Sequence, residues 1–209
     1  MKKTVYIFKD DDFNKIFWEE NKNNILYLEN NNIYFNSKFN GKTKIEFSYS
    51  VISIDEDFEK LLIKLIDRSL FNAEKLSEEE LSYSKNNIEK IKSIISNTLQ
   101  SYLYKEEQKI FEFITDLFIK LLSFHPLING NKRFALSFTV MLLKVLGFYF
   151  KWSGGNKENY LYHKEKITSF VMELSNNKDK SGYDKDKSDY DIIRENIIIW
   201  IKSNSIVSI

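Results

Sequence analysis

The spacing of apolar residues along the chain changes near residue 52. Within residues 25–48, short β-branched and aromatic runs alternate with asparagine-rich breaks, and Asn40-Gly41 is a strong two-residue hairpin signal. These residues predict a small antiparallel meander, with a short helix after Asp12. From residue 53 the apolar spacing is helical. We therefore expect a mainly α protein, with a small β-rich segment over residues 1–52 and a helical domain over residues 53–209.

Several helices are expected after residue 53. The first follows the acidic start at Asp55, and the residues from Ser77 to Glu80 resemble a capping box that opens the second. A third helix is expected over residues 87–95, whereas residues 96–104 have little helical pattern and predict a loop or hairpin. Later patterns predict helices over these residues: 106–124, 131–146, 163–174 and 191–203. Residues 197–201 alone also fit a strand, and residues 176–190 are expected to form a mobile loop.

Two of these helices are apolar on nearly every side, which is typical of helices buried in a core. They cover residues 106–124 and 131–146, and the most apolar stretch of the chain, from Phe134 to Phe150, predicts a buried helix. The only proline, Pro126, ends the first, and Gly147 suits the end of the second. Because both helices are buried, the short polar loop between them is expected to be rigid and well suited to hold a site.

The overall composition narrows the class of protein. Lysine plus arginine (31) nearly balances aspartate plus glutamate (30), which argues against a general nucleic-acid binder. There are no cysteines, so disulfides, thiolate metal sites and a cysteine nucleophile are excluded. No run approaches the roughly 18 apolar residues of a membrane span, and the N-terminal apolar run is too short for a signal peptide. We expect a soluble, cytoplasmic protein.

The loop between the two buried helices combines several features of an anion site. Asn131 stands where a helix N-cap belongs, and the backbone N–H groups after it have no intrahelical acceptor. Gly130 allows a positive φ and a close approach of ligand to backbone. Lys132 and Arg133 lie in the first helical turn, where cations are unfavourable unless an anion offsets them. A bound phosphate is the obvious candidate.

Two further residues complete the candidate site. His125, at the end of the preceding helix, is placed to remove a proton from a hydroxyl that attacks a bound phosphate. Asn129 offers a carbonyl oxygen for a metal or for ordering the loop. Each feature taken singly is common in ordinary loops, and their conjunction between two apolar helices favours a site for phosphoryl or nucleotidyl transfer.

These nine residues resemble the motif of the Fic/Doc family, His-x-Phe-x-(Asp/Glu)-(Gly/Ala)-Asn-(Gly/Lys)-Arg. Leu127 stands at the phenylalanine position and Asn129 at the acidic position. The resemblance covers about residues 85–205 and leaves the N-terminal 50 residues outside it. It implies an all-α Fic-type core and transfer of part of a nucleoside triphosphate to a protein hydroxyl.

The resemblance also implies a role for each loop residue. His125 would be the general base, Gly130 and Asn131 with the adjacent amides would cradle the anion, and Arg133 would hold phosphates. Asn129 stands at the position that holds Mg²⁺ in the family, so ATP and Mg²⁺ are the implied cofactors. Residues 96–104 would match the family's flap, which holds the target segment in extended form.

Lys132, and Leu136 in place of a second arginine, are similar to the Doc (death-on-curing) branch. Members of that branch are toxins of toxin–antitoxin pairs that transfer the terminal phosphate of ATP to a translation elongation factor. The resemblance thus implies a kinase-like toxin with a protein substrate, a cognate antitoxin, and Lys132 beside the nucleotide.

Three alternatives remain open at the level of sequence. The first is a Fic-type transferase that moves AMP or another nucleotidyl group. The second is a catalytically weak binding module of the same fold, in which Asn129 has abolished metal binding. The third is a nucleic-acid-binding repressor, which the charge balance supports little. A near match to the family's self-inhibitory motif also suggests that Glu195 pairs with the phosphate-binding arginine.

Overall fold

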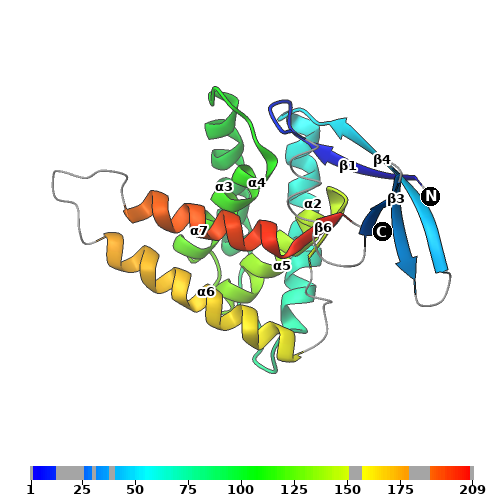
Figure 1. The fold of residues 1–209 in the computed structure, drawn as a ribbon. Helices are drawn as coiled ribbons and strands as arrows, with labels where there is room; N and C mark the ends of the chain where they lie inside the picture. The colour runs from blue at the N-terminus through cyan, green and yellow to red at the C-terminus, as the bar shows by residue number, and fades with distance from the viewer. Residues whose placement is uncertain are drawn as a thin grey trace.

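A computed structural model describes residues 2–12, 26–29, 32–37, 41–150, 157–178 and 189–207. The expected helix after Asp12 lies outside these residues. The N-terminal strands are β1 (Lys2–Ile7), β2 (Leu26–Glu29), β3 (Asn32–Ser37) and β4 (Gly41–Val51). The helices are α2 (Glu56–Glu74), α3 (Lys85–Leu103), α4 (Ile110–Ser123), α5 (Asn131–Val145), α6 (Lys157–Lys178) and α7 (Asp189–Ser203). Two short strands, β5 (Phe148–Phe150) and β6 (Ser205–Val207), complete the described elements (Figure 1). The mainly α fold class is confirmed.

The N-terminal strands form one sheet in the order β1-β4-β3-β2. β2, β3 and β4 pair antiparallel, as the meander prediction requires. β1 pairs in parallel with β4, which the sequence did not predict. In β1 the side chains of Val5 and Ile7 are buried while Tyr6 is partly exposed, so its burial alternates with the period of a strand.

β1 belongs to the same core as the helices. Val5, Ile7 and Phe8 are buried in one cluster with residues of α2, α4 and α5, and the Tyr6 amide donates to the Leu146 carbonyl at 2.9 Å. The sheet stands beside the helices rather than across them (Figure 1). The predicted boundary at residue 52, between a β-rich segment and a helical domain, stays a prediction. The structure shows that β1 packs in the same core as the helices.

Two predicted features between α2 and α4 are wrong. Residues 77–80 do not open a helix: Ser77 Oγ accepts a hydrogen bond from the Glu79 amide, and α3 begins only after Ser84. Residues 96–104 are not a loop, because α3 continues to Leu103. Asn97, Gln100 and Ser101 face outward. Thr98, Leu99 and Tyr102 continue the buried face of the helix.

Other helix boundaries differ by a few residues. α4 begins at Ile110 rather than at residue 106, and Phe148–Phe150 is a strand rather than the end of the buried helix. α6 extends to Lys178 and α7 starts at Asp189, so both ends of the predicted loop over residues 176–190 are helical. The rest of that loop lies outside the described residues. Residues 197–201 are helical, which excludes the strand reading.

α4 lies at the centre of the helical part and contacts α3, α5, α6 and α7. Most of its residues are buried, and α5 is similarly enclosed, as the sequence predicts. Within the part of the chain that the structure describes, no helix is long and apolar enough to cross a membrane.

Candidate functional site

The candidate loop lies between two helices that are fixed in the core. α4 ends at Ser123, and α5 begins at Asn131. Leu127, 4% exposed, anchors the middle of the loop, so an apolar leucine fills a core position there. His125 has φ +43°, an uncommon value for a residue other than glycine, and it turns the chain sharply out of α4. The loop is therefore held at both ends and in its middle.

The start of α5 differs by one residue from the prediction. Gly130, with φ +76°, is the N-cap, and Asn131 is the first helical residue. The Asn131 side chain accepts from the Leu127 amide at 2.8 Å and donates to the Leu127 carbonyl at 3.0 Å. Asn131 thus closes the loop instead of capping the helix. The N-cap Gly130 has no side chain with which to cap this N-terminus, and the first amides of a helix are groups that bind anions.

Arg133 is almost fully buried, with 4% of its side chain exposed. Its Nη1 donates to the Glu79 carbonyl at 2.5 Å, and its Nη2 lies 3.8 Å from Glu79 Oε2. Nη2 has no hydrogen-bond partner among the described residues. A buried guanidinium with an unpaired N–H group is costly, and a ligand oxygen would satisfy it.

Lys132 and His125 lie on the side of the loop that faces α6. Lys132 Nζ donates to Thr168 Oγ1 of α6 at 3.1 Å. His125 is exposed and lines a small cavity of about 90 Å³, together with residues of α4 and of α6, including Leu174 and Ser175. His125 and Lys132 thus both lie next to α6. Arg133 instead contacts Glu79, in the segment between α2 and α3.

A segment that sequence reasoning missed lies across the loop. We call residues 79–82 the strap. The Ile128 amide donates to the Ser82 carbonyl at 3.0 Å, and the Ser82 amide donates to Asn129 Oδ1 at 2.6 Å. A Cβ atom added at Gly130 would lie only 2.1 Å from Leu81 Cδ2, so Leu81 covers the glycine. The lone leucine after three glutamates was the only sequence signal for this contact.

Asn87 is a second residue that the sequence did not single out. Its Nδ2 donates to the Pro126 carbonyl at 2.5 Å, and its Oδ1 accepts from the Ser84 amide at 2.7 Å. Asn87 therefore joins the start of α3 to the candidate loop.

The donor groups near the loop do not form a metal site in this arrangement. Asn129 Oδ1, the predicted metal ligand, accepts the Ser82 amide and so orders the loop. Among the described residues, no group of three histidine, aspartate or glutamate side chains is placed to hold a metal ion. The Ser82 amide uses one of the two lone pairs of this amide oxygen.

The other histidine of the chain, His163, and the suggested inhibitory Glu195 do not contribute to the candidate site. His163 is buried against Phe150 and Trp200, and burial lowers the pKa of its imidazole, so it is a packing residue. Glu195 is exposed on α7, and the ion pair of Arg133 is with Glu79, which contradicts the pairing suggested for Glu195.

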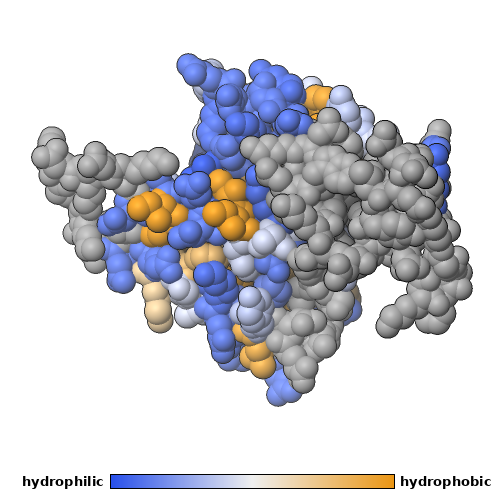
Figure 2. Space-filling view, in the orientation of Figure 1, coloured by the Kyte–Doolittle hydropathy of each residue, from blue (hydrophilic) through white to orange (hydrophobic). Residues whose placement is uncertain are grey.

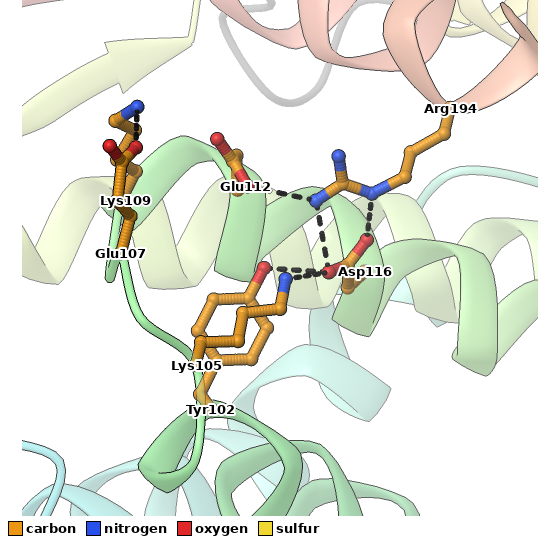
Figure 3. A network of polar contacts seen from close by, with 7 residues as sticks. All are labelled: Tyr102, Lys105, Glu107, Lys109, Glu112, Asp116 and Arg194. Atoms are coloured by element: carbon orange, nitrogen blue, oxygen red, sulfur yellow. Dashed lines mark hydrogen bonds and ion pairs between the residues drawn. The ribbon is translucent and has the colours of Figure 1, made fainter. Parts of the chain in front are cut away.

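A network of charged side chains links α3, α4 and α7 (Figure 3). Asp116 on α4 binds Arg194 of α7 at 2.5 Å and accepts from the Tyr102 hydroxyl of α3 at 2.6 Å. Lys105 and Glu112 add further ion pairs at 3.2 Å. The network joins three helices, and its charges are paired, which identifies it as a structural support.

Comparison of this chain with protein-family models, with curated proteins and with solved structures finds no match.

Proposed function

We propose that this chain is a transferase of the Fic/Doc type that moves the terminal phosphate of ATP to a hydroxyl of a protein target. The main support is the start of α5, where an uncapped helix N-terminus meets Gly130 in the left-handed region and a buried Arg133 with an unpaired Nη2. These are groups that bind a phosphate. His125, exposed and five residues before Gly130 in the chain, supplies a proton acceptor on the α6 side of the same loop.

In this proposal each residue has one task. The His125 imidazole takes the proton of the target hydroxyl, and the hydroxyl oxygen then attacks the terminal phosphorus while ADP leaves. Arg133 and the first amides of α5, near Gly130 and Asn131, hold phosphate oxygens. Lys132, positioned by Thr168, places a second positive charge on the His125 side.

Mg²⁺ would arrive with ATP, since this ion is commonly held by substrate phosphates with few protein ligands. In the arrangement described, the residues around the loop do not supply a separate metal site, and no step of the proposal depends on one.

Residues 96–104 cannot act as the flap that the resemblance implied, because they continue the helix α3 to Leu103. The segment that does run beside the loop is the strap, whose Ser82 already pairs with the backbone of Ile128. We propose that an extended target segment binds at this side of the loop. A translation elongation factor is the target class that the family resemblance suggests, and an antitoxin is the partner that it suggests.

Two alternatives involve the same loop. Transfer of AMP instead of phosphate would use the same residues. Lys132 and Leu136 favour the phosphate reaction only through their resemblance to the Doc branch. A binding module without turnover is favoured by Asn129, whose carbonyl is occupied by Ser82.

The test is intact-mass analysis of translation factors from a lysate after incubation with the full chain, ATP and Mg²⁺. His125→Ala is the matched control, because the side chain is exposed and its removal should leave thermal stability unchanged. We expect a phosphate adduct that the control lacks. An AMP adduct would select the nucleotidyl transferase, and the absence of any adduct, also with Asn129→Asp, would favour the binding module.

A further inference from the structure

We infer that the strap is a closed lid over the proposed phosphate site, and that Leu81, rather than the Glu79 carboxylate, holds it shut. This inference rests on the proposed function, because it concerns access of ATP to that same site. In the described arrangement, the strap lies against Gly130 and Arg133, two residues of that site.

Leu81 occupies the space above Gly130. Glycine in the left-handed region lets a ligand approach the backbone closely, because there is no Cβ atom. Here the nearest group to that missing Cβ is Leu81 Cδ2, at 2.1 Å, followed by Arg133 Nη2 at 3.2 Å. Leu81 is partly buried and packs against the core, so an apolar side chain fills what would be a polar binding position.

The backbone of the strap uses the polar groups of the site. The Glu79 carbonyl accepts from Arg133 Nη1, and the Ser82 carbonyl accepts from the Ile128 amide. The Glu79 carbonyl thus takes an Arg133 donor that the proposed site would offer to phosphate, and the bond to Ile128 holds the strap against the loop. ATP therefore cannot contact both Gly130 and Arg133 until the strap moves.

The Glu79 carboxylate contributes little to closure. It is 81% exposed and 3.8 Å from Arg133 Nη2, a separation at which a solvated ion pair is weak. Nη2 consequently remains without a hydrogen-bond partner in the closed arrangement. A ligand that satisfies this N–H group gains an interaction that the lid does not provide, which favours opening when ATP binds.

The position of the strap allows it to move without unfolding a helix. α2 ends at Glu74 and α3 begins after Ser84, so the strap lies wholly between them. Leu76, which is buried, and Asn87, which binds Pro126, anchor the chain on either side. The moving part thus includes few buried groups, as is typical of segments that open locally.

The experiment measures binding of Mg·ATP to the full chain by titration calorimetry, with wild type, Leu81→Ala and Glu79→Ala. Leu103→Ala is the matched control, since Leu103 is a half-exposed leucine on the last turn of α3. We expect Leu81→Ala to bind about tenfold more tightly, equivalent to ~1.4 kcal/mol, because the open state becomes more populated. Glu79→Ala should stay within about twofold of wild type, and Leu103→Ala should not differ from it.

Hydrogen exchange of the Ser82 amide provides a second measurement. This amide is bound to Asn129 in the closed arrangement, so saturating Mg·ATP should accelerate its exchange in wild type while the amides of α4 stay protected. Equal ATP affinity of wild type and Leu81→Ala, or a larger effect of Glu79→Ala, would overturn the lid as inferred. Tighter binding by Leu81→Ala without any His125-dependent transfer would overturn the proposed function alone. A complete lack of ATP binding in all variants would overturn both.

Discussion

Arg133 is the residue with the least satisfied environment in the candidate site. A guanidinium with 4% exposure and one unpaired N–H group costs the folded state about 1–3 kcal/mol. Proteins tolerate such a cost where a ligand offsets it, and this is why Arg133 rather than the more exposed Lys132 is central to the proposed phosphate site.

Asp11 makes a residue-scale prediction about pH. Burial raises the pKa of its carboxyl from 3.8 to about 6, although the amides of Ile110 and Phe8 donate to it and oppose the rise. Lys202 also lowers it, and Glu112 raises it. Because the folded pKa lies above the unfolded value, the stability linked to this group is fully present below pH 3.8 and is lost as pH rises through about 6.

Asp11→Asn removes this titration while keeping an oxygen that accepts from the same amides. We expect the variant to gain ~1–2 kcal/mol in free energy of unfolding relative to wild type between pH 4 and pH 7, allowing for the partial exposure of the group. Urea unfolding at several pH values measures the difference. A difference between the two proteins that does not change with pH would contradict the prediction.

At the scale of elements, α4 connects the structural network to the site. Its Asp116 holds α3 and α7 together, and its last turn leads directly into His125. Burial by itself would raise the pKa of Asp116, but the hydrogen bonds from Arg194 and Tyr102 outweigh it and keep that pKa below its usual value. The carboxylate is therefore charged and paired at neutral pH.

Asp116→Ala should destabilise the protein strongly, because it leaves the Tyr102 hydroxyl and the Arg194 guanidinium without their partner (Figure 3). We expect a loss of ~2–3 kcal/mol, measured by urea unfolding at neutral pH. Glu107→Ala removes one member of the exposed pair with Lys109 and should cause almost no loss. Equal losses in the two variants would show that the network is not a structural support.

At the scale of the whole molecule, the N-terminal sheet and the helices meet through β1 and the residue after it. Phe8 is fully buried and contacts the rings of Phe58 on α2 and Phe113 on α4. On the face shown in Figure 2, hydrophobic patches lie over α7 within a largely hydrophilic surface. Ile192 and Ile199 of α7 are exposed. The N-terminal strand β1 and the helices thus share one hydrophobic core.

Phe8→Ala tests whether the two parts unfold together. Loss of this ring should cost ~3–4 kcal/mol and lower the thermal midpoint of the helical circular-dichroism signal. Tyr6→Ala, on the partly exposed face of the same strand, is the control and should cost less. A normal helical transition in Phe8→Ala would mean that residues 53–209 fold independently of β1.

Local patterns predicted most of the helices correctly because helix formation depends on neighbours three and four residues apart. The buried helices α4 and α5 and the polar loop between them follow from such patterns, as does the meander of β2, β3 and β4. The prediction for residues 96–104 was wrong because polar residues on the outer face obscured the buried positions Thr98, Leu99 and Tyr102. The prediction for residues 77–80 was wrong because Ser77 caps a turn rather than a helix.

By itself the sequence determined the mainly α class, the two buried helices and the loop that carries His125, Gly130 and Arg133. Their spacing is local, so the chain encodes it directly. Only the tertiary structure decided that Arg133 meets Glu79, 54 residues away in sequence, and that Leu81 covers Gly130. It also decided the parallel pairing of β1 with β4. Contacts of this kind depend on how whole elements pack, and no periodicity within one segment reports them.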